Sequence, residues 1–135
     1  MSKKIRKKIY EKTDGRCYYC GCDLPQRWHK DHLHPLHRNP IGHRDENGKL
    51  LKVEYRDDNC EHPDRDCFEN LVPACPRCNI RKSTLTVEGF RQVIQDQVNQ
   101  LNSHSNQYEL AKDFGLIEET ENEVVFYFEK SKNGK

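Results

Sequence analysis

Apolar side chains recur at helical spacing near the start of the chain. Ile5, Ile9 and Tyr10 would share one face of a helix whose other positions are mostly lysine and arginine. The Asp14-Gly15 pair that follows is typical of a turn. We therefore predict a short basic amphipathic helix that ends at this turn.

A second helical pattern lies in the last third of the chain. Thr86 is a typical N-cap residue. The apolar positions after it repeat every three or four residues, at Val87, Phe90, Ile94, Val98 and Leu101. Ser105 is placed to cap another short helix through Phe114, which Gly115 would end. We therefore expect residues 84–135 to form a largely helical extension.

Three regions have patterns typical of strands. Residues 27–37 should form the first strand. The Asn47-Gly48 pair should be the turn of a hairpin, with residues 50–55 as the strand after it. The clearest strand is predicted at residues 123–129, Glu-Val-Val-Phe-Tyr-Phe-Glu, and Leu116-Ile117 is a candidate to pair with it.

The composition changes this picture because the chain is very polar. Of its 135 residues, 33% are apolar and 33% are charged, and the mean hydropathy is −1.09. A core of so few apolar residues would be thin, so an additional cross-link should stabilise the fold. Seven cysteines and seven histidines could supply it. The odd cysteine number and the absence of an export signal favour metal binding over disulfides.

The charge pattern bears on partners and location. Residues 1–16 hold seven basic and two acidic residues, which suits binding to phosphate. Residues 105–129 hold seven acidic residues and one basic residue, which most simply form a solvated surface. The N-terminus has no apolar stretch typical of a signal peptide, and no segment is long enough to cross a bilayer. We therefore expect a cytoplasmic protein without a membrane partner.

Two cysteine pairs have the spacing of a zinc site. Cys17 and Cys20 form the first pair, Cys75 and Cys78 form the second, and 54 residues separate the pairs. Four thiolates about 2.3 Å from one ion make a closed tetrahedral zinc site, which stabilises a fold rather than catalysing. We therefore predict a structural zinc that joins the start of the working unit to its last helix.

Three cysteines remain, and their role is open. Cys60, His62 and Cys67 are close in sequence and could form a second zinc site, with Cys22 or His43 as further candidates. Ordinary thiols on an insertion are an equally good interpretation, because the spacing is irregular.

The residues around and between the cysteine pairs resemble a known family. The pattern runs Cys-x-x-Cys, Asp31-His32-x-x-Pro, Asn70-Leu-x-x-x-Cys-x-x-Cys and Asn79-x-x-Lys82. This series is similar to the motif of HNH endonucleases, and the resemblance covers about residues 5–83 except the insertion-like stretch 38–68.

The resemblance implies an α+β fold. It would consist of a zinc-stapled ββα-metal finger, also called a His-Me finger, over residues 1–83. The helical extension over residues 84–135 would end in the short strand and pack on this core.

The resemblance also implies a reaction, the metal-dependent hydrolysis of phosphodiester bonds in DNA. His32 would be the general base that activates water, and Asn70 would hold its loop or ring in orientation. Asp31 and Asn79 would hold a divalent cation, and their oxygen atoms suit Mg²⁺ or Mn²⁺. The cation would keep positions open for water and for phosphate oxygens.

Basic residues near the last cysteine pair are candidates to bind phosphate. They are Arg77, Arg81 and Lys82. A solvated basic face is an equally good interpretation for Arg77. His34 would share a strand face with His32, but an ordinary surface histidine is the simpler interpretation.

The alternative function is a non-catalytic zinc module that binds nucleic acid or a protein. Such a module would need the cysteines but none of the residues Asp31, His32, Asn70 and Asn79. RNA and branched DNA are alternative substrates, although no residue is identifiable as a reader of a 2′-hydroxyl. Restriction, homing and phage packaging are all open as pathways. The extension could also mediate a homodimer or bind a protein partner.

Overall fold

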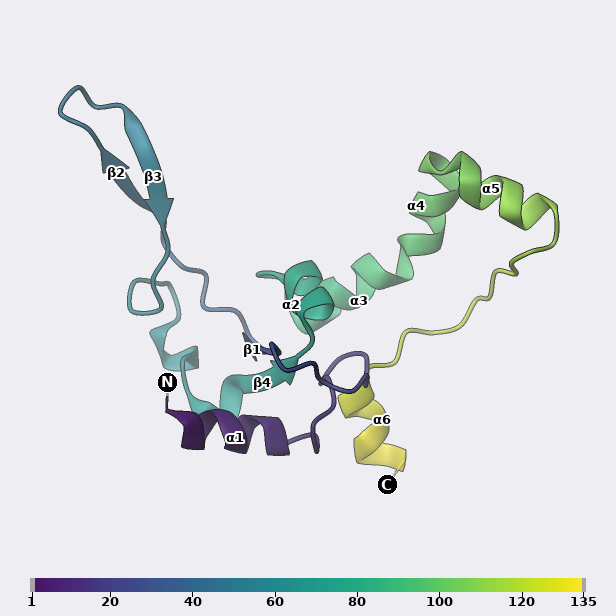
Figure 1. The fold of residues 1–135 in the computed structure, drawn as a ribbon, viewed down its shortest axis with the longest axis horizontal. Helices are drawn as coiled ribbons and strands as arrows, with labels where there is room; N and C mark the ends of the chain where they lie inside the picture. Colours follow the sequence, from purple (N-terminus) through teal and green to yellow (C-terminus); the bar gives the residue numbers. More distant parts are fainter. Residues whose placement is uncertain (1, 135) are drawn as a thin grey trace.

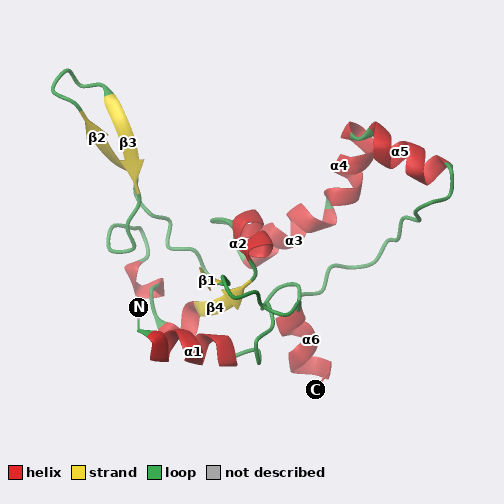
Figure 2. Cartoon of the chain, in the orientation of Figure 1, coloured by secondary structure: helices red, strands yellow, loops and turns green. Residues whose placement is uncertain are grey.

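Two small antiparallel sheets and a series of helices make up the fold (Figures 1 and 2). The computed structural model describes the backbone of residues 2–134 and the side chains of residues 2–130. Helix α1 (Lys3–Glu11) comes first and is followed by strands β1 (His29–His32), β2 (Ile41–Arg44), β3 (Leu50–Glu54) and β4 (Leu71–Ala74). Helices α2 (Pro76–Lys82), α3 (Val87–Gln95), α4 (Gln97–His104), α5 (Asn106–Asp113) and α6 (Tyr127–Gly134) complete the chain. The chain is thus a mixed α and β protein with small antiparallel sheets.

The strands β1 and β4 form one sheet although the insertion lies between them. They pair antiparallel, with Asp31 opposite Val72. β1 is shorter than the strand predicted over residues 27–37, because the side chain of Asn70 binds the backbone N–H and C=O of His34 and replaces the next strand partner there. α2 follows β4 directly and begins at Pro76, a residue type favoured at the first position of a helix.

The insertion contains the predicted hairpin. β2 and β3 pair antiparallel, and the turn between them is closed by Asp45, whose carboxylate accepts hydrogen bonds from the backbone of Asn47 and Lys49. Gly48 adopts φ +84°, a left-handed conformation that few other residues tolerate. In Figure 1 this hairpin extends away from the rest of the molecule. Its apolar side chains, such as Leu51 at 63% exposure, remain in solvent.

The basic helix α1 packs against the first sheet through one apolar residue and two cations. Ile9 is fully buried in a small cluster with Trp28 and Leu71. The guanidinium of Arg6 stacks 3.8 Å from the centre of the Trp28 ring, and the Lys12 ammonium donates to the backbone carbonyl of Leu71 at 2.6 Å. These cations therefore hold the helix in place and are less available to a ligand.

The extension is helical up to Asp113, and its caps are the predicted ones. The Thr86 hydroxyl accepts a hydrogen bond from Gly89 at the start of α3, and the Ser105 hydroxyl accepts one from Tyr108 at the start of α5. The predicted apolar series is divided between two helices, because α3 ends and α4 begins at Asp96. Figure 1 shows that α4 and α5 lie far from the body before the chain returns to it.

The predicted strand at residues 123–129 is wrong. Residues 117–126 form neither helix nor strand, and α6 begins at Tyr127. The aromatic residues of this run pack against residues 18–19, where the backbone N–H of Tyr127 donates to Tyr19 and that of Phe128 donates to Tyr18. Phe126 enters the core and is 2% exposed. The apolar run is therefore explained by packing on this loop, and it has no strand partner.

One larger apolar cluster joins the extension to the first part of the chain. Phe90 and Phe126 stack with ring centres 5.5 Å apart, and each meets Tyr19 edge to face. This cluster also contains Val72, Ala74 and three of the paired cysteines.

None of the helices in residues 2–134 combines the length and the apolar character that a membrane span requires.

The docking of the returning segment can be tested at Phe126. Phe126→Ala should lower the free energy of unfolding by about 3–5 kcal/mol, because it leaves a cavity between aromatic rings. Phe114→Ala is the matched control, because Phe114 is 77% exposed, and it should change stability by about 0.5 kcal/mol or less. Urea denaturation of the zinc-loaded protein measures both. Equal stabilities of the two variants would show that Phe126 is not part of the core.

Candidate functional site

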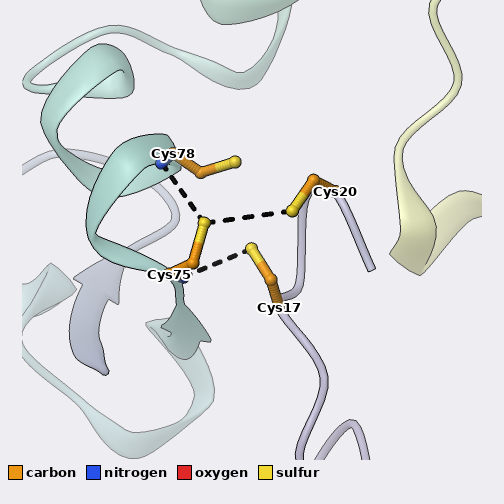
Figure 3. Close-up of side chains that lie close together, drawn as sticks. All are labelled: Cys17, Cys20, Cys75 and Cys78. Atoms are coloured by element: carbon orange, nitrogen blue, oxygen red, sulfur yellow. Dashed lines mark hydrogen bonds between the residues drawn. The ribbon is translucent and has the colours of Figure 1, made fainter. Parts of the chain in front are cut away.

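The two cysteine pairs meet in space and form a cluster that could hold zinc (Figure 3). Cys17 and Cys20 come from the loop after α1, whereas Cys75 and Cys78 lie at the start of α2. All four sulfurs lie within 4.8 Å of one another, and the sulfurs of Cys20 and Cys75 are 3.9 Å apart. Sulfurs about 2.3 Å from a tetrahedral ion would be about 3.8 Å apart, so the donor set and spacing fit zinc.

The protein supports negative charge on the Cys17 sulfur, whereas burial raises the pKa of Cys75 and the hydrogen bond with Cys17 raises that of Cys78. The backbone N–H of Cys75 donates to the sulfur of Cys17 at 3.3 Å. A hydrogen bond with the Cys78 side chain and further backbone hydrogen bonds, which outweigh burial, lower the pKa of Cys17 to about 4. A thiolate is the form that binds metal. Cys17, Cys75 and Cys78 are buried, as expected for a closed structural site.

Arg77, predicted as a phosphate ligand, is exposed and lies beside the cysteine cluster. A hydrogen bond to the Cys20 sulfur, together with the charge of the neighbouring cysteines, raises the pKa of Arg77. A guanidinium in this position offsets the charge of the thiolates. Arg77 and Arg81 both line a cavity of about 370 Å³ beside the cysteines, together with Phe90 and Ile94.

A different cavity gathers the predicted catalytic residues. Its volume is about 310 Å³, and Asp31, His32 and Asn79 all contribute to its wall. The first two come from β1 and the third comes from α2. Lys30 and Arg38 also line it, and neither was singled out from the sequence.

Asp31 is held in a buried network. Its Oδ2 atom accepts a hydrogen bond from the Tyr19 hydroxyl and lies 3.3 Å from the ammonium of Lys82. Burial raises the pKa of Asp31, and Lys82 opposes that effect. Oδ1 makes no hydrogen bond within the described part of the chain, so it is the oxygen left to bind a cation.

Lys82 therefore does not fit its predicted role as a phosphate ligand. Its side chain is fully buried, and the ammonium donates to the backbone carbonyl of His32 at 3.0 Å while it pairs with Asp31. The sequence placed Lys82 near the surface of the last helix, but a charge paired within the core can be stable without solvent. Lys82 positions the two predicted catalytic residues relative to α2.

Asn79 has one free oxygen as well. Its amide nitrogen lies 2.7 Å from Nδ1 of His29, and its Oδ1 has no hydrogen-bond partner among the residues described. His29 and Asp31 are two residues apart on β1 and share one face of the strand. The face of β1 toward α2 therefore presents one histidine and one carboxylate to the amide of Asn79.

His32 has a partner that sequence reasoning missed. Its Nε2 atom lies 2.9 Å from a carboxylate oxygen of Asp66. His32, Asp57 and Asp66 have ligand atoms within 4.8 Å of one another and form the second group that could hold a metal ion in the described residues. Both aspartates belong to the insertion, and no motif or spacing marked them.

Asn70 orients the backbone around this pair rather than the imidazole itself. Its amide donates to the carbonyls of His34 and Arg65 at 2.9 and 2.7 Å, and its oxygen accepts from the backbone N–H of His34. His34 follows His32 by two residues, and Arg65 precedes Asp66. Asn70 therefore fixes both chain segments that carry the His32–Asp66 contact, in keeping with the predicted role of holding the His32 loop.

The structure does not bring the remaining cysteines together as a metal site. Among the described residues, Cys60, His62 and Cys67 are not part of either group that could bind metal. The Cys60 thiol hydrogen-bonds to the carbonyl of Asp57, and Cys67 is exposed.

The chain was compared with protein families, curated proteins and solved structures. No family model, curated protein or solved structure matches it.

The zinc centre predicts a specific pattern of metal content. Purified protein should contain one zinc per chain by elemental analysis, and Cys78→Ser should lose most of it. Cys67→Ser is the control, because this exposed thiol lies outside the cluster, and it should retain the metal. Chelation should also unfold the protein, since structural zinc contributes folding free energy. Two zinc ions per chain would instead support a second site in the insertion.

Proposed function

We propose that this protein is a metal-dependent endonuclease of the HNH type that hydrolyses phosphodiester bonds in DNA. The observation that carries the proposal is the convergence of Asp31, His32 and Asn79 on one cavity. The sequence motif assigns these three residues to the reaction, and they come from elements separated by the whole insertion. An antiparallel strand pair followed by a helix, β1, β4 and α2, also has the order of a ββα finger.

The hydrogen bond to Asp66 suits His32 for taking a proton. If Nε2 carries the imidazole proton and donates it to Asp66, Nδ1 has an available lone pair. Nδ1 has no hydrogen-bond partner in the described part of the chain. His32 can then accept a proton from water as the water oxygen bonds to phosphorus and the phosphorus–oxygen bond to the leaving 3′ oxygen breaks, with a second water protonating that oxygen.

Asp31 and Asn79 fit a hard divalent cation. Each offers an oxygen without a hydrogen-bond partner among the described residues, and oxygen donors suit Mg²⁺ or Mn²⁺. When bound, such an ion stabilises negative charge on the phosphate and on the leaving oxygen. The hydrogen bond from Tyr19 and the ion pair with Lys82 fix the Asp31 carboxylate by its other oxygen, so the free oxygen is held in one orientation.

A nicking assay tests the reaction. Zinc-loaded wild type should convert supercoiled plasmid to nicked or linear DNA with Mg²⁺ or Mn²⁺, and His32→Ala should reduce the rate by about 10²–10⁴-fold, as expected for loss of a general base. His104→Ala is the control, because this exposed histidine at the end of α4 has no contact with the cavity, and it should be fully active. A wild type that binds DNA without cutting it under any of these metals would instead indicate the non-catalytic zinc module.

The position of the cation can be tested separately by Mn²⁺ binding to zinc-loaded protein, followed by electron paramagnetic resonance. Asn79→Ala should weaken binding about 10–100-fold, whereas Asp66→Asn should change it little. Asn79 is the better choice than Asp31, because removing the Asp31 charge would leave buried Lys82 unpaired. If Asp66→Asn weakens Mn²⁺ binding and Asn79→Ala does not, the ion lies on His32, Asp57 and Asp66. His32 could then not act as the general base.

A further inference from the structure

The cavity needs a cationic group to bind the DNA backbone, and the residues predicted for this role lie elsewhere. Lys82 is buried in an ion pair, and Arg77 and Arg81 line the other cavity, beside Phe90. Neutralising phosphate charge supplies much of the affinity of any DNA-binding protein. The basic residues of the catalytic cavity itself are therefore the ones to consider.

Lys30 is one of these residues. It lines the cavity next to the predicted catalytic residues, and it lies two positions before His32 on β1, so both side chains are on the same face of the strand. Its ammonium makes no hydrogen bond or ion pair within the described part of the chain. Such a half-buried, unpaired ammonium beside the general base is placed to contact the phosphate that is attacked.

Arg38 is the other. Its Nε atom donates to Asp57 at 2.7 Å, and the backbone of Arg38 pairs with that of Cys60. These contacts hold the guanidinium at the wall of the cavity, and its two terminal nitrogens have no hydrogen-bond partner among the described residues. A guanidinium fixed through Nε can still donate from both terminal nitrogens to phosphate oxygens.

The electrostatics of Asp57 support a shared cationic wall. Burial raises the pKa of Asp57, but the hydrogen bond and charge of Arg38, with further contributions from His32 and Lys30, outweigh burial and lower it. Lys30 and Arg38 therefore act on the same region. Asp57 offsets one of these charges, and the hydrogen bond it accepts also keeps Arg38 in position.

We propose that Lys30 and Arg38 form the phosphate-binding site of the cavity, in place of the basic residues of α2. Lys30 contacts the phosphate beside His32, and Arg38 contacts the phosphate backbone next to it. Ser83 and Thr84, which also line the cavity, complete its polar wall. The inference rests on the proposed function, because the ligand is the DNA backbone that the enzyme would cut.

Binding without cleavage tests this site. A fluorescein-labelled 20-base-pair duplex of mixed sequence is titrated with zinc-loaded protein by fluorescence anisotropy, with Ca²⁺ in place of Mg²⁺ and over a series of salt concentrations. Loss of one phosphate contact should reduce the slope of log K against log salt by about 0.9, which weakens binding about eightfold at 0.1 M salt. We expect this result for Lys30→Gln and for Arg38→Gln, and Lys30→Arg should restore the slope.

The control is Arg81→Gln, which removes an exposed charge from the other cavity and should leave the slope within about 0.3 of wild type. The proposal is overturned if Lys30→Gln and Arg38→Gln bind like wild type, or if Arg81→Gln produces the loss instead. Because the measurement records binding alone, it can fail while the nicking assay succeeds. Zinc content and circular dichroism of each variant confirm that the fold is intact.

Discussion

The fold depends on the contact between two segments that bring four sulfurs together. The knuckle at residues 17–22 has almost no secondary structure of its own, yet Tyr19 at its centre is one of the most buried side chains. The position of a segment without regular secondary structure depends on its contacts with the rest of the chain. Without a metal ion shared by the two cysteine pairs, the knuckle would be fixed by a few backbone hydrogen bonds, by the hydrogen bond from Tyr19 to Asp31 and by apolar contacts such as those with Phe90 and Phe126. A chain with so few apolar residues cannot rely on such packing alone.

The same knuckle connects the cysteine cluster to the cavity lined by Asp31, His32 and Asn79. Cys17 and Cys20 flank Tyr19, and the hydroxyl of Tyr19 donates to Asp31. On the other side, Cys78 lies in the first turn of the helix that ends with Lys82, which pairs with the same carboxylate. The geometry of Asp31 is therefore set from both halves of the cysteine cluster. A metal that holds the cysteines together would also hold the carboxylate in position.

Local chemistry in the sequence was enough to predict the cysteine cluster, the caps of α3 and α5 and the hairpin turn at Gly48. Each of these depends on spacing or on a backbone preference within a few residues. The strand predicted at residues 123–129 failed for a different reason. A short run of apolar residues shows only that a segment is buried, and here Phe126 meets aromatic rings instead of a neighbouring strand. Similarly, nothing local distinguishes Lys82, a buried ion-paired lysine, from a solvated one.

The insertion explains why the site could be predicted only in part. Asp31, His32 and Asn79 lie in segments that the motif covers, so the sequence could identify them as candidates. Asp66 comes from a stretch that the motif leaves out. Asn70, a motif residue, binds the carbonyl of the residue before it and so helps to hold Asp66 next to His32.

Asn70 thus has a second effect beyond its contact with the His32 loop. One side chain ties the segment of β1 to the insertion, and Arg38 enters the cavity from the same insertion. The insertion is therefore a structural component of the cavity.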